Sequence, residues 1–105
     1  MSYKLLNVVE LSITVVTGSG TATFNVNGVV LQTSVDAPAA ATYDQKCYDS
    51  EDTFYQAKSR SGDTVDYDPW VVVARNGNVT FKLENATDGD YKVYLYVDQH
   101  SVVGR

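Results

Sequence analysis

The sequence predicts an all-β protein, an antiparallel β-sandwich of about six to eight strands. Short segments of alternating apolar and polar residues recur along the chain, separated by turn residues at roughly ten-residue spacing. The composition agrees, because β-branched residues are abundant and the 8 Tyr outnumber the 3 Phe, 1 Trp and 1 Met. At 105 residues and without a linker or internal repeat, residues 1–105 are expected to form a single domain.

The first third of the chain predicts three strands. Two turns separate them: one contains Gly18 and Gly20, and the other is the Asn27-Gly28 pair, which favours a type I′ hairpin. A bend near Asn7 would divide the first strand into two. We expect these strands to form a meander with consecutive neighbours paired. The alternating segments are residues 4–16, 21–26 and 29–35.

The last third of the chain is equally regular. Residues 70–74 form a continuous apolar run, which predicts a strand buried on both faces. Asn76-Gly77 predicts a hairpin turn into an alternating strand at residues 79–84. In the final strand, at residues 91–98, the apolar positions and the polar positions fall on opposite faces.

The middle of the chain is less regular. Residues 36–42 contain a short Ala run, for which a loop is favoured over a turn of helix. Residues 43–68 are rich in acidic residues, with a short strand expected at residues 53–59 and a turn at residues 61–63.

Charge and hydropathy exclude several partners. The net charge is −5, the pI is near 4.5 and no basic cluster is present, so we expect no nucleic-acid partner. No run approaches the roughly 18 apolar residues that a membrane span needs. The N-terminus lacks the pattern of a signal peptide, which points to the cytoplasm or a virion unless a leader has been removed. Cys47 is the sole cysteine, and in acidic surroundings it is expected to be buried and inert.

Residues 88–98, Asp-Gly-Asp-Tyr followed by alternating positions and a final Asp, resemble the penultimate-strand motif of bacterial immunoglobulin-like domains. The resemblance implies an Ig-like sandwich, while the residues alone leave a jelly-roll-like order open. It also implies a tyrosine corner, in which the Tyr91 hydroxyl bonds to nearby backbone. The chain departs from the pattern, since it has no Cys pair and its Trp70 follows a proline. Such domains serve adhesion, virion decoration, enzyme appendages and fibre assembly, so the resemblance does not identify a ligand.

Three groups of residues are candidates for binding. Asp63, Asp66 and Asp68 either offer carboxylate oxygens to Ca²⁺, the one cofactor that the sequence suggests, or form a solvated acidic loop. Tyr94 and Tyr96 are expected to face outward, as a contact platform or as part of a second buried face.

The third group consists of aromatic residues interleaved with acidic ones. Stacking rings and acidic side chains are what carbohydrate sites use, but the same residues can pin a long loop to a sheet. We rank this region first as a binding site. Its aromatic members are Tyr43, Tyr48, Tyr55, Tyr67 and Trp70.

No catalytic constellation stands out. Carboxylate pairs are unavoidable among 13 acidic residues, but a small sandwich rarely provides the cleft of a glycosidase. His100, the only histidine, is expected in an exposed tail.

We therefore expect a non-enzymatic interaction module that binds a protein partner or a copy of itself. A virion decoration, a fibre or a surface-assembly subunit would use such a module. The alternative is a lectin-like carbohydrate-binding module that uses Tyr and Trp stacking, with or without Ca²⁺. A small hydrolase ranks third.

Overall fold

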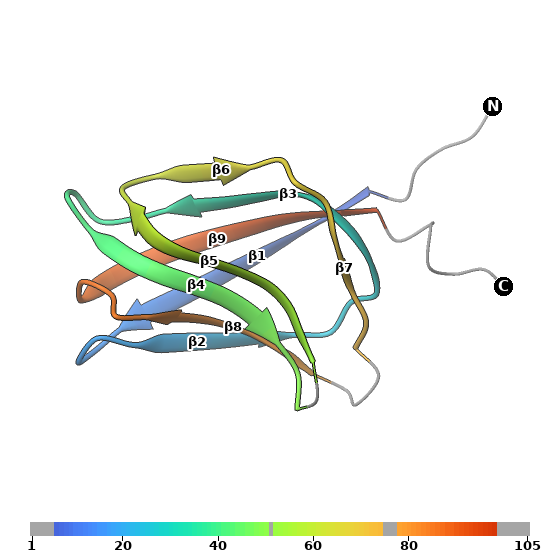
Figure 1. Ribbon diagram of the computed structural model, residues 1–105, viewed down its shortest axis with the longest axis horizontal. Coiled ribbons are helices and arrows are strands. Elements are labelled where there is room, and N and C mark those ends of the chain that lie inside the picture. Colours follow the sequence, from blue (N-terminus) through green and yellow to red (C-terminus); the bar gives the residue numbers. More distant parts are fainter. Residues whose placement is uncertain (1–5, 51, 75–77, 99–105) are drawn as a thin grey trace, which may run out of the picture.

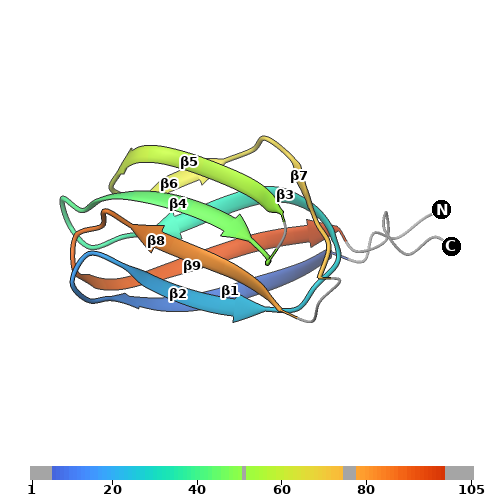
Figure 2. The same ribbon diagram turned by 60° about the horizontal axis from the view of Figure 1, so that its bottom comes forward.

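The computed structural model describes residues 6–50, 52–74 and 78–98, which form nine strands and no helix. The strands make two antiparallel sheets packed face to face, as Figures 1 and 2 show from two directions. The strands are β1 (Leu6–Val15), β2 (Gly20–Phe24), β3 (Gly28–Asp36), β4 (Thr42–Tyr48), β5 (Thr53–Ser61), β6 (Thr64–Asp66), β7 (Trp70–Val72), β8 (Val79–Glu84) and β9 (Gly89–Asp98).

One sheet has the order β1-β9-β3-β6, with β7 also paired to β3, and the other has the order β2-β8-β4-β5. The predicted all-β sandwich is therefore confirmed. The number of described strands, nine, is higher than the expected six to eight. The middle of the chain contributes β4, β5 and β6, where only one strand was expected.

The core lies between the sheets and follows from the alternation of side chains. On β8, the side chains of Val79, Phe81 and Leu83 are fully buried and the intervening ones are partly exposed. On β9, four alternate positions from Tyr91 onward are buried in the same way, as the sequence predicted. Cys47 is also fully buried within this core, and burial raises the pKa of its thiol.

The predicted meander is wrong. β1 pairs with β9, and β2 pairs with β8 in the opposite sheet, so the first three strands are not paired with one another. Asn27 and Gly28 do not form a hairpin; the chain crosses there from one sheet to the other. The Asn27 side chain accepts a hydrogen bond from the Ala74 amide at 2.6 Å. A Cβ atom at Gly28 would lie 2.6 Å from the carbonyl oxygen of Asp98, so glycine allows a close approach of two strands.

The apolar run at residues 70–74 is not buried on both faces. β7 extends only from Trp70 to Val72 and pairs with β3, and Val71 is 51% exposed. The strand lies at the edge of its sheet, so only its inner face is covered. The predicted turn at Asn76-Gly77 and the predicted tail residue His100 lie outside the described residues.

The loop and the turn predicted in the middle of the chain are both present. Residues 37–41 connect β3 to β4 without a helix, and Gly62 lies between β5 and β6 with a positive φ of 65°.

The contact implied by the tyrosine-corner resemblance also exists. The Tyr91 hydroxyl donates to the carbonyl oxygen of Thr87 at 2.6 Å, and the Tyr91 ring packs edge-on against Tyr43. This contact fixes the turn by which β8 enters β9.

Candidate functional site

The outer face of the five-stranded sheet carries a group of aliphatic and aromatic side chains. Pairing registers place them across neighbouring strands, because residues directly opposite one another share a face. Tyr96 lies opposite Val8 of β1, and Tyr94 lies opposite Ser34, which is in turn opposite Val65 of β6. We call this surface the apolar face, and it consists of Val8, Val29, Val65, Val71, Tyr94 and Tyr96.

The apolar face is most exposed at its flanks. β9 is the central strand, so its neighbours half cover Tyr94 and Tyr96, which face outward as predicted. The valines on the outer strands are more open: Val8 is 48%, Val65 47% and Val71 51% exposed. An ion pair between Lys92 and Glu10, at 2.8 Å, lies beside the two tyrosines. Val8 lies directly beside Tyr96, while Gln32 and Ser34 of β3 lie between the two tyrosines and the valines of β6 and β7. The face therefore combines apolar side chains with a few neutral polar ones.

The outer face of the opposite sheet is polar. It presents threonines and charged side chains, and Glu84 receives ion pairs from Lys46 at 3.5 Å and from Lys82 at 3.4 Å. Tyr48, a predicted ligand-binding residue, lies on this face with the Lys46 ammonium 5.3 Å from its ring centroid. The two outer faces of the sandwich therefore differ in chemistry: among the described residues, the exposed valines of the strands gather on the face built on β9.

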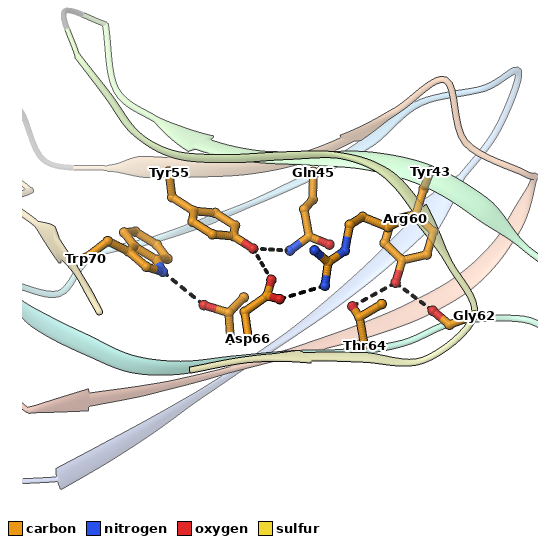
Figure 3. A network of polar contacts seen from close by, with 9 residues as sticks. Tyr43, Gln45, Tyr55, Arg60, Gly62, Thr64, Asp66 and Trp70 are labelled. Carbon is orange, nitrogen blue, oxygen red and sulfur yellow. Dashed lines mark hydrogen bonds and ion pairs between the residues drawn. The ribbon is translucent and has the colours of Figure 1, made fainter. Parts of the chain in front are cut away.

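A network of side chains joins the two sheets along the side where β5 meets β6 and β7 (Figure 3). Its centre is Tyr55, whose ring stacks on Trp70 with centroids 4.8 Å apart. The Tyr55 hydroxyl donates to Asp66 at 2.5 Å and accepts from the Gln45 amide at 2.6 Å. Arg60 completes the network with an ion pair to Asp66 at 2.7 Å.

Two further contacts extend this sheet-to-sheet network. The Trp70 indole donates to the Thr33 hydroxyl at 2.9 Å, and the Tyr43 hydroxyl donates to the Gly62 carbonyl at 2.6 Å. Burial raises the pKa of Tyr43 and of Tyr55. These three predicted aromatic residues therefore hold the fold together, while Tyr67 is the member of the group with a largely exposed ring, at 70%.

The three carboxylates predicted as calcium ligands point to different partners. Asp63 accepts a hydrogen bond from the Ala37 amide at 2.8 Å, Asp66 is bound to Tyr55 and Arg60, and Asp68 is exposed beyond the end of β6. Within the described ranges, no group of three or more His, Cys, Asp or Glu side chains is arranged to hold a metal ion. Asp63 lies in the turn before β6, Asp66 ends the strand and is held by Tyr55 and Arg60, and Asp68 lies beyond the strand. Sequence proximity therefore does not bring the three carboxylates together.

An open polar groove was not predicted from the sequence. Its volume is about 320 Å³, and its lining consists of Thr42, Tyr43, Asp44, Ser59, Arg60, Ser61 and Asn85. Asp44 organises it, accepting from the Ser59 amide at 2.8 Å and from the Asn85 side chain at 2.9 Å. These hydrogen bonds lower the pKa of the Asp44 carboxyl.

The groove forms at a β-bulge. Between Tyr43 and Gln45 the register of β4 with β5 shifts, and Ser59 has a positive φ of 58°. Asn85, with a φ of 48°, ends β8 nearby. No local pattern in the sequence marks this bulge, because it depends on the pairing of two strands that are irregular in sequence.

The comparisons with known proteins leave the family open. No protein-family model, curated protein or solved structure matches the chain. In the part of the chain that the structure describes, there is no helix of the length and hydrophobicity needed to cross a membrane.

Proposed function

We propose that this chain is a non-enzymatic interaction module that acts through protein contact, as a structural or assembly component. A virion decoration, a fibre or a surface-assembly subunit would use it in this way. The observation that carries the proposal is the apolar face, which exposes three valines on the same side of the sheet as two tyrosines while the opposite face is polar. The resemblance of residues 88–98 to bacterial immunoglobulin-like domains, and the Tyr91 contact that it implies, support the same proposal.

The chemistry of this face suits a protein partner. Tyrosine is enriched in protein interfaces because one ring buries a large apolar area while its hydroxyl still finds polar partners. Complete burial of a valine side chain is worth about 1.5–3 kcal/mol, so covering three half-exposed valines contributes roughly 2–4 kcal/mol before the cost of association. The net charge of −5 favours a neutral or basic protein surface over an acidic one.

Two matched variants test this role of the apolar face. Val71→Lys places a charge on the apolar face, and Thr80→Lys places the same charge on the polar face. At about 1 mM protein, sedimentation detects self-association with a free energy as weak as about −4 kcal/mol. Of the two variants, Val71→Lys is expected to associate more weakly than the unmodified protein, and Thr80→Lys is expected to associate equally well. Equal association of both variants and the unmodified protein would contradict a role for the apolar face.

Carbohydrate binding is the second candidate, and the polar groove around Asp44 is the observation that favours it. Carboxylate and amide side chains can accept and donate hydrogen bonds to sugar hydroxyls. A glycan array compared between the unmodified protein and Asp44→Ala tests this candidate. A glycan signal that Asp44→Ala abolishes would support it, and an array without signal would reject it. Thermal unfolding with and without millimolar Ca²⁺ tests the calcium-assisted form. A higher melting temperature with Ca²⁺ would support it, and an unchanged melting temperature would reject it.

A further inference from the structure

Four edges bound the two sheets of the sandwich. The edges of one sheet are β1 on one side and β6 with β7 on the other, and those of the second sheet are β2 and β5. An edge strand presents backbone N–H and C=O groups that can pair with another strand. Proteins usually prevent this with short strands, bulges, prolines or charged side chains.

Three of these edges carry such protection. β5 has two irregularities in its register with β4 and bears Lys58 and Arg60. β6 and β7 are three residues each, and Pro69 lies between them. β2 is only five residues long. None of the three offers a long regular strand for pairing.

β1 is neither short nor bulged, and its one charged side chain is paired. Its ten residues pair with β9 without a shift in register, and they contain neither proline nor glycine. Glu10 is its single charged residue, and Lys92 neutralises it at 2.8 Å. The edge is therefore locally near neutral, although the whole chain carries a charge of −5. Repulsion between two copies is correspondingly low at this strand.

The backbone groups that face away from β9 can be identified. Val16, one residue beyond the end of β1, bonds to Ser19 with both its amide and its carbonyl, so its polar groups point away from β9. The Thr14 carbonyl oxygen also points to that side, because a Cβ atom at Gly20 would lie 2.5 Å from it. In an antiparallel strand, alternate residues present their polar groups to the same side. By this alternation, the amides and carbonyls of Val8, Glu10 and Ser12 lie on the free edge of β1.

We propose that the free edge of β1 pairs in antiparallel fashion with β1 of a second copy of this chain. Antiparallel pairing of two identical strands is self-complementary about a two-fold axis, so the same edge serves both copies. The sheets of the two copies then form one continuous sheet, and the apolar faces lie side by side. A register that sets Glu10 opposite Val8 of the second copy keeps the two glutamates from facing each other directly. It also leaves Thr14, whose carbonyl oxygen lies against Gly20 of β2, outside the pairing. This inference rests on the proposed assembly function.

Residue-resolved amide hydrogen exchange tests the pairing, because only every second amide of β1 would gain a hydrogen bond to the second copy. Exchange at the amides of Val8, Glu10 and Ser12 is expected to slow at least tenfold as the protein concentration rises from about 10 μM to about 1 mM. The amides of Val9 and Leu11 already bond to β9, so their exchange should not change between the two concentrations. Contact through the apolar face alone would not produce this alternation.

Substitutions give the second readout. Ser12→Lys places a charge at the proposed contact and also opposite Lys92 of β9, so urea unfolding first establishes that this variant keeps its fold. Thr23→Lys places a charge on β2 in the other sheet as the control. Ser12→Pro removes an amide on the free edge and leaves the bonds to β9. Both Ser12 variants are expected to weaken self-association at least tenfold, and Thr23→Lys is expected to leave it unchanged.

The outcomes separate this inference from the proposed function. An oligomer that Ser12→Lys leaves intact, and in which the amides of Val8, Glu10 and Ser12 exchange as fast as in dilute solution, overturns the pairing of β1 but leaves an assembly role standing. A monomer at every concentration overturns both.

Discussion

Removing one hydroxyl group from the sheet-to-sheet network should weaken the whole fold. Tyr55→Phe keeps the ring that stacks on Trp70 and deletes the oxygen that joins Gln45 to Asp66. Arg60 remains paired with Asp66, so the variant isolates the contribution of the hydroxyl.

The size of the effect follows from what the hydroxyl satisfies. A hydrogen bond to a charged group contributes about 1.5–3 kcal/mol, and the Asp66 bond is of this kind. Gln45 is 1% exposed, so its amide would lose a partner in a place that water does not readily reach, at a cost of about 1–3 kcal/mol. Together these two contributions are expected to lower the free energy of unfolding of Tyr55→Phe by about 2.5–6 kcal/mol and the melting temperature by roughly 10 °C or more.

Urea denaturation followed by tryptophan fluorescence measures this change, because Trp70 stacks directly on the altered ring. Tyr67→Phe is the control, since Tyr67 is largely exposed and its change should stay within about 0.5 kcal/mol. In the double variant Tyr55→Phe/Gln45→Leu, part of the loss should be recovered, because an apolar side chain replaces the stranded amide. A Tyr55→Phe variant as stable as Tyr67→Phe would refute the role given to the network.

Three further changes test other parts of the fold. Tyr91→Phe removes the bond to Thr87 at the entry to β9 and should cost about 1 kcal/mol in thermal unfolding; an unchanged melting temperature would count against the tyrosine corner. Gly28→Ala should cost about 1–3 kcal/mol, because its Cβ would lie 2.6 Å from a carbonyl oxygen of β9, and an equally stable variant would disprove that close approach. Burial raises the pKa of Tyr43, Tyr55 and Tyr91 above the ordinary value near 10. Above that pH the unfolded chain releases these protons first, so the free energy of unfolding should fall from about pH 10 upward in denaturant titrations, less steeply in Tyr55→Phe; a flat profile would contradict this.

The sequence predicted individual strands better than their partners. Alternation is a local property, so the inward positions of β8 and β9 could be assigned from the pattern alone. Pairing is not local: Asn27-Gly28 has the composition of a hairpin turn but serves a crossing between sheets. β1 and β2 pair with β9 and β8, which lie far away in the sequence, and no short window of sequence contains that information.

The candidate surface was predicted in part. The outward orientation of Tyr94 and Tyr96 followed from the period of β9, but Val8, Val65 and Val71 did not stand out among many valines. They become one surface only through the registers that join β1, β6 and β7 to the same sheet.

The role of the middle aromatic residues could not be decided from composition. Aromatic rings beside acidic side chains are typical of a sugar-binding site, and they are equally suited to packing and hydrogen bonding between two sheets. The bulges in β4 and β5 hide the alternation that would have placed Tyr55 on the inner side of β5.

The mass of the unmodified protein in solution, measured by light scattering from about 10 μM to about 1 mM, tests the central claim most directly. An assembly component is expected to show a mass that rises with concentration from one chain toward two or more. A mass of one chain, constant over the whole range, would contradict the account.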